Sequence, residues 1–336
     1  MKRPPHHRNG GFQNNHGDFE PKSLADVIRW RWNASRRGLP PRPAAPIPTQ
    51  QADFDFIRAN HGARQQPAVT WIGHATVLAQ LGGINLLTDP VFSERASPLS
   101  FVGPKREQPP GLTLAQLPHI DAVLVSHNHY DHLDLASVRA LARQPGGSPL
   151  FVAPLGLKAW FQARGIERVV ELDWWQAERL AGVDIVLVPA QHWSARGLND
   201  RMKTLWGGFA VFAPDCQLFF AGDTGYSRDF ADIRQHFADC QRDGGFDIAL
   251  IPIGAYEPRW FMQSQHVNVE EALKIHADLG AKRSLGVHWG TFELTDEALD
   301  EPPRQLALQR EALGLQEDEF FTLAIGQTRR LPPRGV

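Results

Sequence analysis

Four side chains of types that commonly bind metal ions lie close together in the stretch SHNHYDHLD: His127, His129, Asp131 and His132. The stretch follows directly after the apolar segment AVLV, which has the composition of a buried strand. In an extended chain, residues two apart point to the same side, so His127 and His129 can bind one ion. A turn into the next helix would then bring Asp131 and His132 to a second ion nearby.

Three more candidate ligands stand where other apolar segments end. His192 follows IVLVPAQ, Asp223 follows LFFAG and His288 follows LGV. Imidazoles and carboxylates without thiolates suit Zn²⁺, with Fe and Mn as alternatives. Asp223 is the natural bridging carboxylate between two ions, and Asp131 and Asp223 are the candidate catalytic carboxylates.

Two further residues are candidates for holding the ligands in place. His74 in WIGHAT and Asp89 in LLTDP could hydrogen-bond to ligands, because metal-bound histidines usually have such a second partner. The alternative for Asp89 is a turn-forming role before Pro90. Two ions close together lower the pKa of a shared water to about 7 and stabilise charge on the attacked group. The pattern therefore predicts a hydrolase of esters, amides or phosphodiesters.

The segments that carry these residues alternate between strand and helix patterns. Short apolar runs ending in Gly, Asp or His are typical of strands: AVTWIGHAT, INLLTDP, DAVLVSHNHYDH, VDIVLVPAQHW, CQLFFAGDTG, DIALIPIGA and RSLGVHWG. Helical patterns lie between some of them, as in LASVRALARQ and NVEEALKIHADLG. This alternation predicts an α/β architecture whose loops at the carboxyl ends of the strands hold the chemistry.

The composition changes along the chain. Residues 1–62 are interpreted as an N-terminal extension, and residues 63–330 as a hydrolase domain. Within the extension, KSLADVIRWRWN has apolar residues at helical spacing and predicts a short amphipathic helix. The helix could pack on the domain's own core, or it could lie on an anionic membrane surface through its Trp and Arg side chains. We assign no role to His6, His7 and His16.

Composition and charge narrow the classes of function. The chain has 336 residues, of which 42% are hydrophobic, enough for a sizeable core. Its 35 Lys and Arg nearly balance 37 Asp and Glu, so we expect no nucleic acid partner. Cys216 and Cys240 form neither a CxxC pair nor a disulfide framework, and no segment reads as a signal peptide or a membrane span. We therefore expect a cytoplasmic protein that meets lipid, if at all, peripherally.

These motifs resemble two nested families. The HxHxDH stretch with the later His, Asp and His is similar to the metallo-β-lactamase superfamily, whose fold is a four-layer αββα sandwich with metals at one rim. More narrowly, the chain resembles the N-acyl-phosphatidylethanolamine-hydrolysing phospholipase D family from about Val69 to about Pro303. The strings that carry this resemblance are TWIGHAT, LLTDPVFSERASP, GPKR, IDAVLVSHNHYDHLD, ELDWW, QHW, FFAGDTGY, IPIGAYEPRWFM, QHV, HWGTF and EPP.

The resemblance implies two zinc ions and a homodimer. The two implied ligand sets are His127, His129, His192 and Asp223 for one ion, and Asp131, His132, Asp223 and His288 for the other. Tyr130 and His266 match positions that contact the phospholipid in the family. The implied reaction hydrolyses N-acyl phosphatidylethanolamine to N-acylethanolamine and phosphatidic acid.

Three functions remain open on the sequence. The first is the phospholipase D reaction, which an apolar groove leading to the metals would favour. The second is hydrolysis of another ester, a lactone or a soluble phosphodiester, which a polar, basic pocket mouth would favour. The third is a metalloprotein that binds a lipid or a partner without turnover, and the presence of all seven candidate ligands argues against it.

Overall fold

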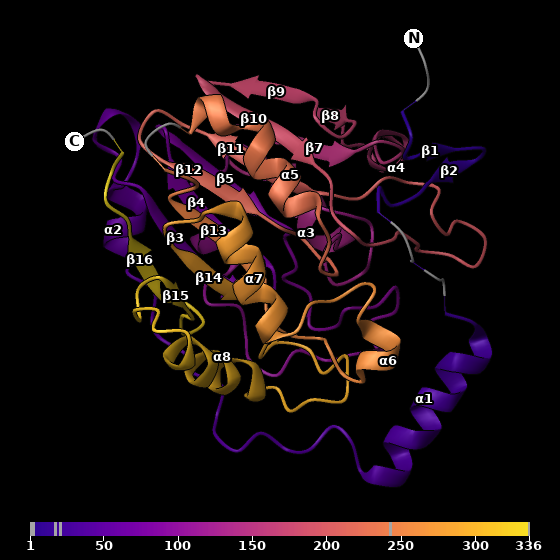
Figure 1. Ribbon diagram of the computed structural model, residues 1–336. Helices are drawn as coiled ribbons and strands as arrows, with labels where there is room; N and C mark the ends of the chain where they lie inside the picture. The colour runs from indigo at the N-terminus through magenta and orange to yellow at the C-terminus, as the bar shows by residue number, and fades with distance from the viewer. Residues whose placement is uncertain (1–3, 17–18, 20–21, 242–243, 335–336) are drawn as a thin grey trace.

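Two mixed β-sheets packed face to face form the body of the computed structural model (Figure 1). The structure describes residues 4–16, 19, 22–241 and 244–334. The strand order of the first sheet is β16 (Thr328–Arg330), β3 (Ala68–Gly73), β4 (Thr76–Leu81), β5 (Ile84–Thr88), β6 (Ala122–Leu124), β7 (Leu150–Pro154) and β8 (Val169–Leu172). The order of the second is β15 (Phe320–Phe321), β14 (Ser284–Val287), β13 (Ile248–Pro252), β12 (Gln217–Phe220), β11 (Gly208–Phe212), β10 (Val183–Val188) and β9 (Ala177–Leu180).

The two sheets follow the same plan. In the first, neighbours from β16 through β3 and β4 to β5 are antiparallel, and those from β5 to β8 are parallel. In the second, neighbours from β9 to β12 are antiparallel and those from β12 to β15 are parallel. Parallel neighbours need crossover connections, and helices lie between consecutive parallel strands in most cases.

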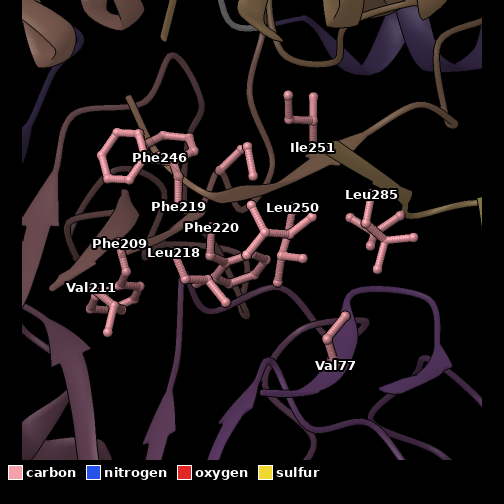
Figure 2. Packing of buried hydrophobic residues seen from close by; sticks show 14 of the residues in the cluster. Val77, Phe209, Val211, Leu218, Phe219, Phe220, Phe246, Leu250, Ile251 and Leu285 are labelled. Carbon is pink, nitrogen blue, oxygen red and sulfur yellow. The ribbon is translucent and has the colours of Figure 1, made fainter. Parts of the chain in front are cut away.

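The core between the sheets follows from strand alternation. On β4, Val77 and Ala79 point into the space between the sheets, whereas Leu78 points to the outer face. On β12, Phe219 packs against Phe230 of helix α5 on the outer side of the second sheet. Figure 2 shows Phe219 among these buried side chains, with Val77 approaching from the opposite sheet. Both faces of each sheet are therefore buried.

Helices cover the outer faces. The helices are α1 (Leu24–Arg37), α2 (Phe54–Ala59), α3 (Leu135–Leu141), α4 (Lys158–Gln162), α5 (Asp229–His236), α6 (Arg259–Met262), α7 (Val269–Leu279) and α8 (Glu301–Ala312), with 3₁₀ turns at Gly62–Arg64, Leu114–Gln116 and Ala238–Cys240. Residues of α2, α3 and α4 pack on the first sheet, and residues of α5, α7 and α8 on the second. The predicted four-layer αββα fold is confirmed, as are the predicted strands and the helices α3 and α7.

The predicted helix of the N-terminal extension is present as α1, beside α6 (Figure 1). It begins at a capping box between Ser23 and Asp26 and ends at Gly38, whose left-handed φ of 65° suits a helix C-terminus. On one side, Trp30 packs against Phe261, with ring centroids 4.9 Å apart. No helix among the described residues is long and apolar enough to cross a bilayer. The domain boundary at residue 62 stays a prediction.

Phe219 provides a test of the packing between β12 and the helices outside it. Truncation of this fully buried ring in Phe219→Ala should lower the free energy of unfolding by about 3–5 kcal/mol, because it removes apolar contacts and leaves a cavity. Chemical denaturation measures the loss. Leu308→Ala, at a site that is 62% exposed on α8, is the control and should change little. Equal effects of the two changes would contradict the assigned packing.

Candidate metal centre

The seven candidate ligands meet at one rim of the molecule, where strands of both sheets end. His127 follows β6 of the first sheet, while His192, Asp223 and His288 follow β10, β12 and β14 of the second. The ring nitrogens and carboxylate oxygens gather in two groups, and within each group they lie within 4.8 Å of one another. The structure therefore places together every residue that the sequence proposed as a ligand. Their role as ligands stays a prediction.

The first group combines three imidazoles with one carboxylate. His127 Nε2 lies 2.8 Å from His129 Nδ1, which lies 3.3 Å from His192 Nε2. Asp223 Oδ2 is 3.9 Å from the Nε2 atoms of both His127 and His192. His127 and His129 thus present nitrogens to one point, as their spacing in an extended segment predicts.

The second group forms after the chain turns. The backbone N–H of His132 donates to the carbonyl of His129, which marks the turn (3.2 Å). Asp131 Oδ2 then lies 3.4 Å from His132 Nε2 and 3.5 Å from His288 Nε2. Asp223 reaches this group as well, because its Oδ2 is 3.0 Å from His132 Nε2 and its Oδ1 is 3.1 Å from His288 Nε2. Asp223 contacts both groups and is therefore placed to bridge two ions.

Hydrogen bonds on the far side of the rings fix which nitrogen carries the proton. His192 Nδ1 faces the carbonyl oxygen of Gln265 at 2.9 Å, and His132 Nδ1 faces Asp89 Oδ2 at 2.6 Å. Both Nδ1 atoms must donate, since their partners can only accept. When the two rings are neutral, their Nε2 atoms therefore direct lone pairs at the carboxylate of Asp223. Lone pairs and carboxylate oxygens that converge in a buried space need a cation between them, so the donor set fits divalent metal ions.

The pKa shifts of the histidines also indicate that these groups need a cation. Burial lowers the pKa of His192 to about 3 and that of His129 to about 4, which leaves both rings neutral and able to bind metal. Burial also acts on His132, but the carboxylates of Asp223, Asp131 and Asp89 outweigh it and raise the pKa of His132 well above its usual value. A proton on His132 takes the place that a bound cation would otherwise fill.

Asp89 and His74 lie where the sequence proposed supporting residues. Asp89 accepts from His132 and also from the N–H and hydroxyl of Ser126 (2.7 and 2.5 Å). The Ser126 hydroxyl lies 2.9 Å from His127 Nδ1, so one carboxylate orients two imidazoles. His74 Nε2 is 3.1 Å from Asp131 Oδ2, inside the second group itself. The sequence missed Ser126, although it directly precedes His127.

The two predicted substrate contacts occupy different positions. His266 is half-buried beside the centre, with Nδ1 3.9 Å from Asp223 Oδ2. Tyr130 points away from the ligands, and its hydroxyl donates to the carbonyl of Arg196 (2.9 Å). The Arg196 guanidinium stacks 4.0 Å from the Tyr130 ring centroid. Tyr130 therefore belongs to a neighbouring cavity rather than to the ligand groups.

The fold and the donor set define a metallo-β-lactamase-type protein, and comparison with known proteins agrees. A family model described as a beta-lactamase superfamily domain matches residues 84–289. The structure of an isothiocyanate hydrolase from Delia radicum gut bacteria superposes with a TM-score of 0.62, at 20% identity, over 79% of this chain and 99% of that chain. The chain belongs to the metallo-β-lactamase superfamily and is a metal-dependent hydrolase of that superfamily.

Sequence relatives identify the family within this superfamily to which the chain belongs. N-acyl-phosphatidylethanolamine-hydrolyzing phospholipase D 1 of Caenorhabditis elegans is 42% identical over 270 residues, which are 77% of this chain and 74% of the relative. An uncharacterised protein of Mycobacterium tuberculosis is 39% identical over 344 residues, covering 98% of this chain and 85% of that protein. The chain belongs to the N-acyl-phosphatidylethanolamine-hydrolysing phospholipase D family.

Asp89 provides a test of how the ligands are held. Asp89→Asn should weaken metal affinity by about 10- to 100-fold, because an amide with one acceptor oxygen cannot serve His132 and both Ser126 donors. Competition with a chelating dye measures the affinity. The matched control is Asp184→Asn. Asp184 lies on β10, is partly exposed and forms an ion pair with Arg179 of β9. If both variants bind metal as the parent does, Asp89 does not support the centre.

Proposed function

We propose that this protein is a binuclear zinc phosphodiesterase of the phospholipase D type. Its substrate is N-acyl phosphatidylethanolamine, and its products are N-acylethanolamine and phosphatidic acid. The observation that carries the proposal is the pair of imidazole and carboxylate groups that Asp223 joins. Zinc is the proposed metal because the donors are imidazoles and carboxylates, and iron or manganese would satisfy the same donors.

The protein residues have distinct tasks in this reaction. Two bound ions would lower the pKa of a shared water to about 7 and stabilise negative charge on the phosphoryl oxygens. Asp89 and the Gln265 carbonyl hold the imidazoles so that their lone pairs face the ions. Burial lowers the pKa of His266 to about 3, so this ring is neutral and can donate a hydrogen bond to a phosphoryl oxygen.

A cavity of about 510 Å³ is lined in part by Tyr130, which stands between the candidate ligands His129 and Asp131 in the sequence. Its lining combines apolar and charged side chains: Pro98, Leu99, Tyr130 and Trp160 stand beside Arg95, Arg139, Arg164 and Arg196, and beside the carboxylates of Glu94 and Asp134. The lining offers apolar surface, which suits acyl chains, together with arginines, which suit a phosphate. A substrate that carries both a phosphate and acyl chains is complementary to both parts, which favours the phospholipid.

Helix α1 is the proposed contact with the membrane surface. Leu24, Ile28 and Trp32 form a stripe at four-residue spacing, and they are 75, 60 and 65% exposed. The face that packs on the domain is a different one, around Trp30. Arg29 and Arg31 border the stripe, which suits an anionic lipid surface. Homodimer formation and a cytoplasmic location remain predictions alongside this one.

The proposed reaction can be tested by isotope labelling. Zinc-loaded protein incubated with N-acyl phosphatidylethanolamine in H₂¹⁸O should release N-acylethanolamine, and the label should enter phosphatidic acid, because water attacks phosphorus and the ethanolamine oxygen leaves. Mass spectrometry identifies both products. His127→Ala, which lacks one candidate ligand, should release neither. Intact lipid after incubation with protein of verified metal content would contradict the proposal and favour another ester, lactone or soluble phosphodiester as substrate.

The membrane contact can be tested separately. Ile28→Ser together with Trp32→Ser should weaken binding to phosphatidylglycerol-containing vesicles by about tenfold or more, since each side chain contributes roughly 1.5–3 kcal/mol when fully buried in an apolar environment. Sedimentation with vesicles measures the bound fraction. Leu308→Ser with Leu313→Ser, at exposed leucines of and next to α8, is the matched control. Equal vesicle binding by both double variants would contradict the proposal that α1 contacts the membrane surface.

A further inference from the structure

Residues 4–16, which we call the N-terminal arm, lie against the rim that carries the metal centre. Strands β1 (His7–Arg8) and β2 (Gly11–Phe12) pair antiparallel as a hairpin. The N–H of Phe12 donates to the carbonyl of Met202 (2.8 Å), and the Phe12 ring is buried. The arm is therefore held by the hydrolase domain on both its backbone and its side chains.

Two histidines anchor the first part of the arm. His6 Nε2 and His7 Nε2 lie 2.6 and 2.8 Å from the two carboxylate oxygens of Asp173, one on each. His6 is buried and its ring lies 4.3 Å from that of Trp174. The sequence alone assigned no role to these two histidines, and the structure shows that both contact Asp173. Each ring donates to its own oxygen, so hydrogen bonding accounts for this cluster without a metal ion.

The far end of the arm reaches a candidate ligand directly. Asn14 Oδ1 accepts from the backbone N–H of His192 (3.0 Å), and Asn14 Nδ2 donates to the backbone carbonyl of the same residue (3.0 Å). Asn14 Oδ1 also accepts from the indole N–H of Trp206 (3.1 Å). One side-chain amide therefore satisfies both main-chain groups of His192, as a neighbouring strand would.

The next residue anchors the arm on the other side. Asn15 Nδ2 donates to Asp229 Oδ1 at the start of α5 (3.0 Å). His16 Nε2 lies 3.4 Å from Asp229 and 3.3 Å from Asp232. Asn14 is thus fixed between two anchored segments, and its amide has little freedom to leave His192.

We propose that Asn14 is a positioning residue of the metal centre, through which the N-terminal arm sets the affinity of the ion bound by His192. The inference rests on the proposed role of His192 as a ligand. Asn14 fixes the main chain of His192, and the Gln265 carbonyl fixes the ring through Nδ1. With both constrained, Nε2 is aimed at His129 and Asp223. Loss of the amide frees the main chain and misdirects this one nitrogen.

The experiment measures zinc release from the full-length chain during titration with a chelator, in place of turnover. Asn14→Ala should weaken the binding of one of the two ions by about 10- to 100-fold and leave the binding of the other unchanged. Gln13→Ala is the matched control from the same arm, because the Gln13 amide donates only to the Pro5 carbonyl (2.9 Å). Asn14→Asp keeps the size of the side chain and the oxygen that accepts from the His192 N–H. It places a second oxygen, which cannot donate, next to the His192 carbonyl. Asn14→Asp should show the same selective loss of zinc affinity, and it replaces Asn14→Ala in the experiment if Asn14→Ala does not fold.

A double-mutant cycle separates positioning from general stabilisation. His192→Ala removes the nitrogen through which Asn14 is proposed to act, so adding Asn14→Ala to it should cause no further loss of zinc affinity. Additive losses, equal weakening of both ions or no loss in Asn14→Ala would each overturn the proposal. Binding of a single ion by the parent chain would overturn the binuclear function, and the cycle would still decide the role of Asn14. Binding of no ion would overturn both.

Discussion

The structure depends on one electrostatic constraint, which is the convergence of lone pairs and carboxylates in a space with too few hydrogen-bond donors. Asp223 faces the Nε2 atoms of His132 and His192, whose other ring nitrogens are already committed as donors to Asp89 and to the Gln265 carbonyl. Such an arrangement is costly when it contains no positive charge. The rest of the rim is explained by the need to hold these groups together until a cation neutralises them.

The fold meets this constraint with strand ends from two sheets and with local backbone strain. His74, Asp89 and His288 each follow a strand and have left-handed φ values of 54°, 31° and 62°. Side chains with a Cβ rarely adopt this conformation, and each instance costs of order 1–3 kcal/mol. Hydrogen bonds compensate: the N–H of His288 donates to the carbonyl of His74, and the N–H of His74 donates to the hydroxyl of Thr291. The two sheets are joined directly at the centre.

The sequence predicted those parts of this arrangement that leave a local pattern. The spacing of His127 and His129, and the apolar runs before His192 and His288, follow from backbone geometry and needed no tertiary information. Other strands were missed: β4, β7 and β11, which are mostly buried, and the edge strand β9, whose alternation of exposed and half-buried residues does not resemble a buried run. Asn14 had no signal at all, because its partner lies 178 residues away and a lone Asn in a polar segment looks like solvent-exposed chain.

The metal centre by itself does not select a substrate, since paired ions act alike on many esters and the fold supports many activities. Selectivity must come from groups that contact the parts of the substrate that do not react. For the proposed substrate, Arg196 is the candidate for this task, because its guanidinium lines the cavity beside Tyr130, 4.0 Å from the ring of Tyr130 and 5.1 Å from that of Trp160. Burial lowers the pKa of Arg196, and contact with the two rings restricts the orientation of its guanidinium. A soluble phosphodiester would gain from the charge yet leave the apolar lining in contact with water. An acylated phosphodiester covers the charge and the rings together, and this complementarity is the physical reason to prefer a phospholipid.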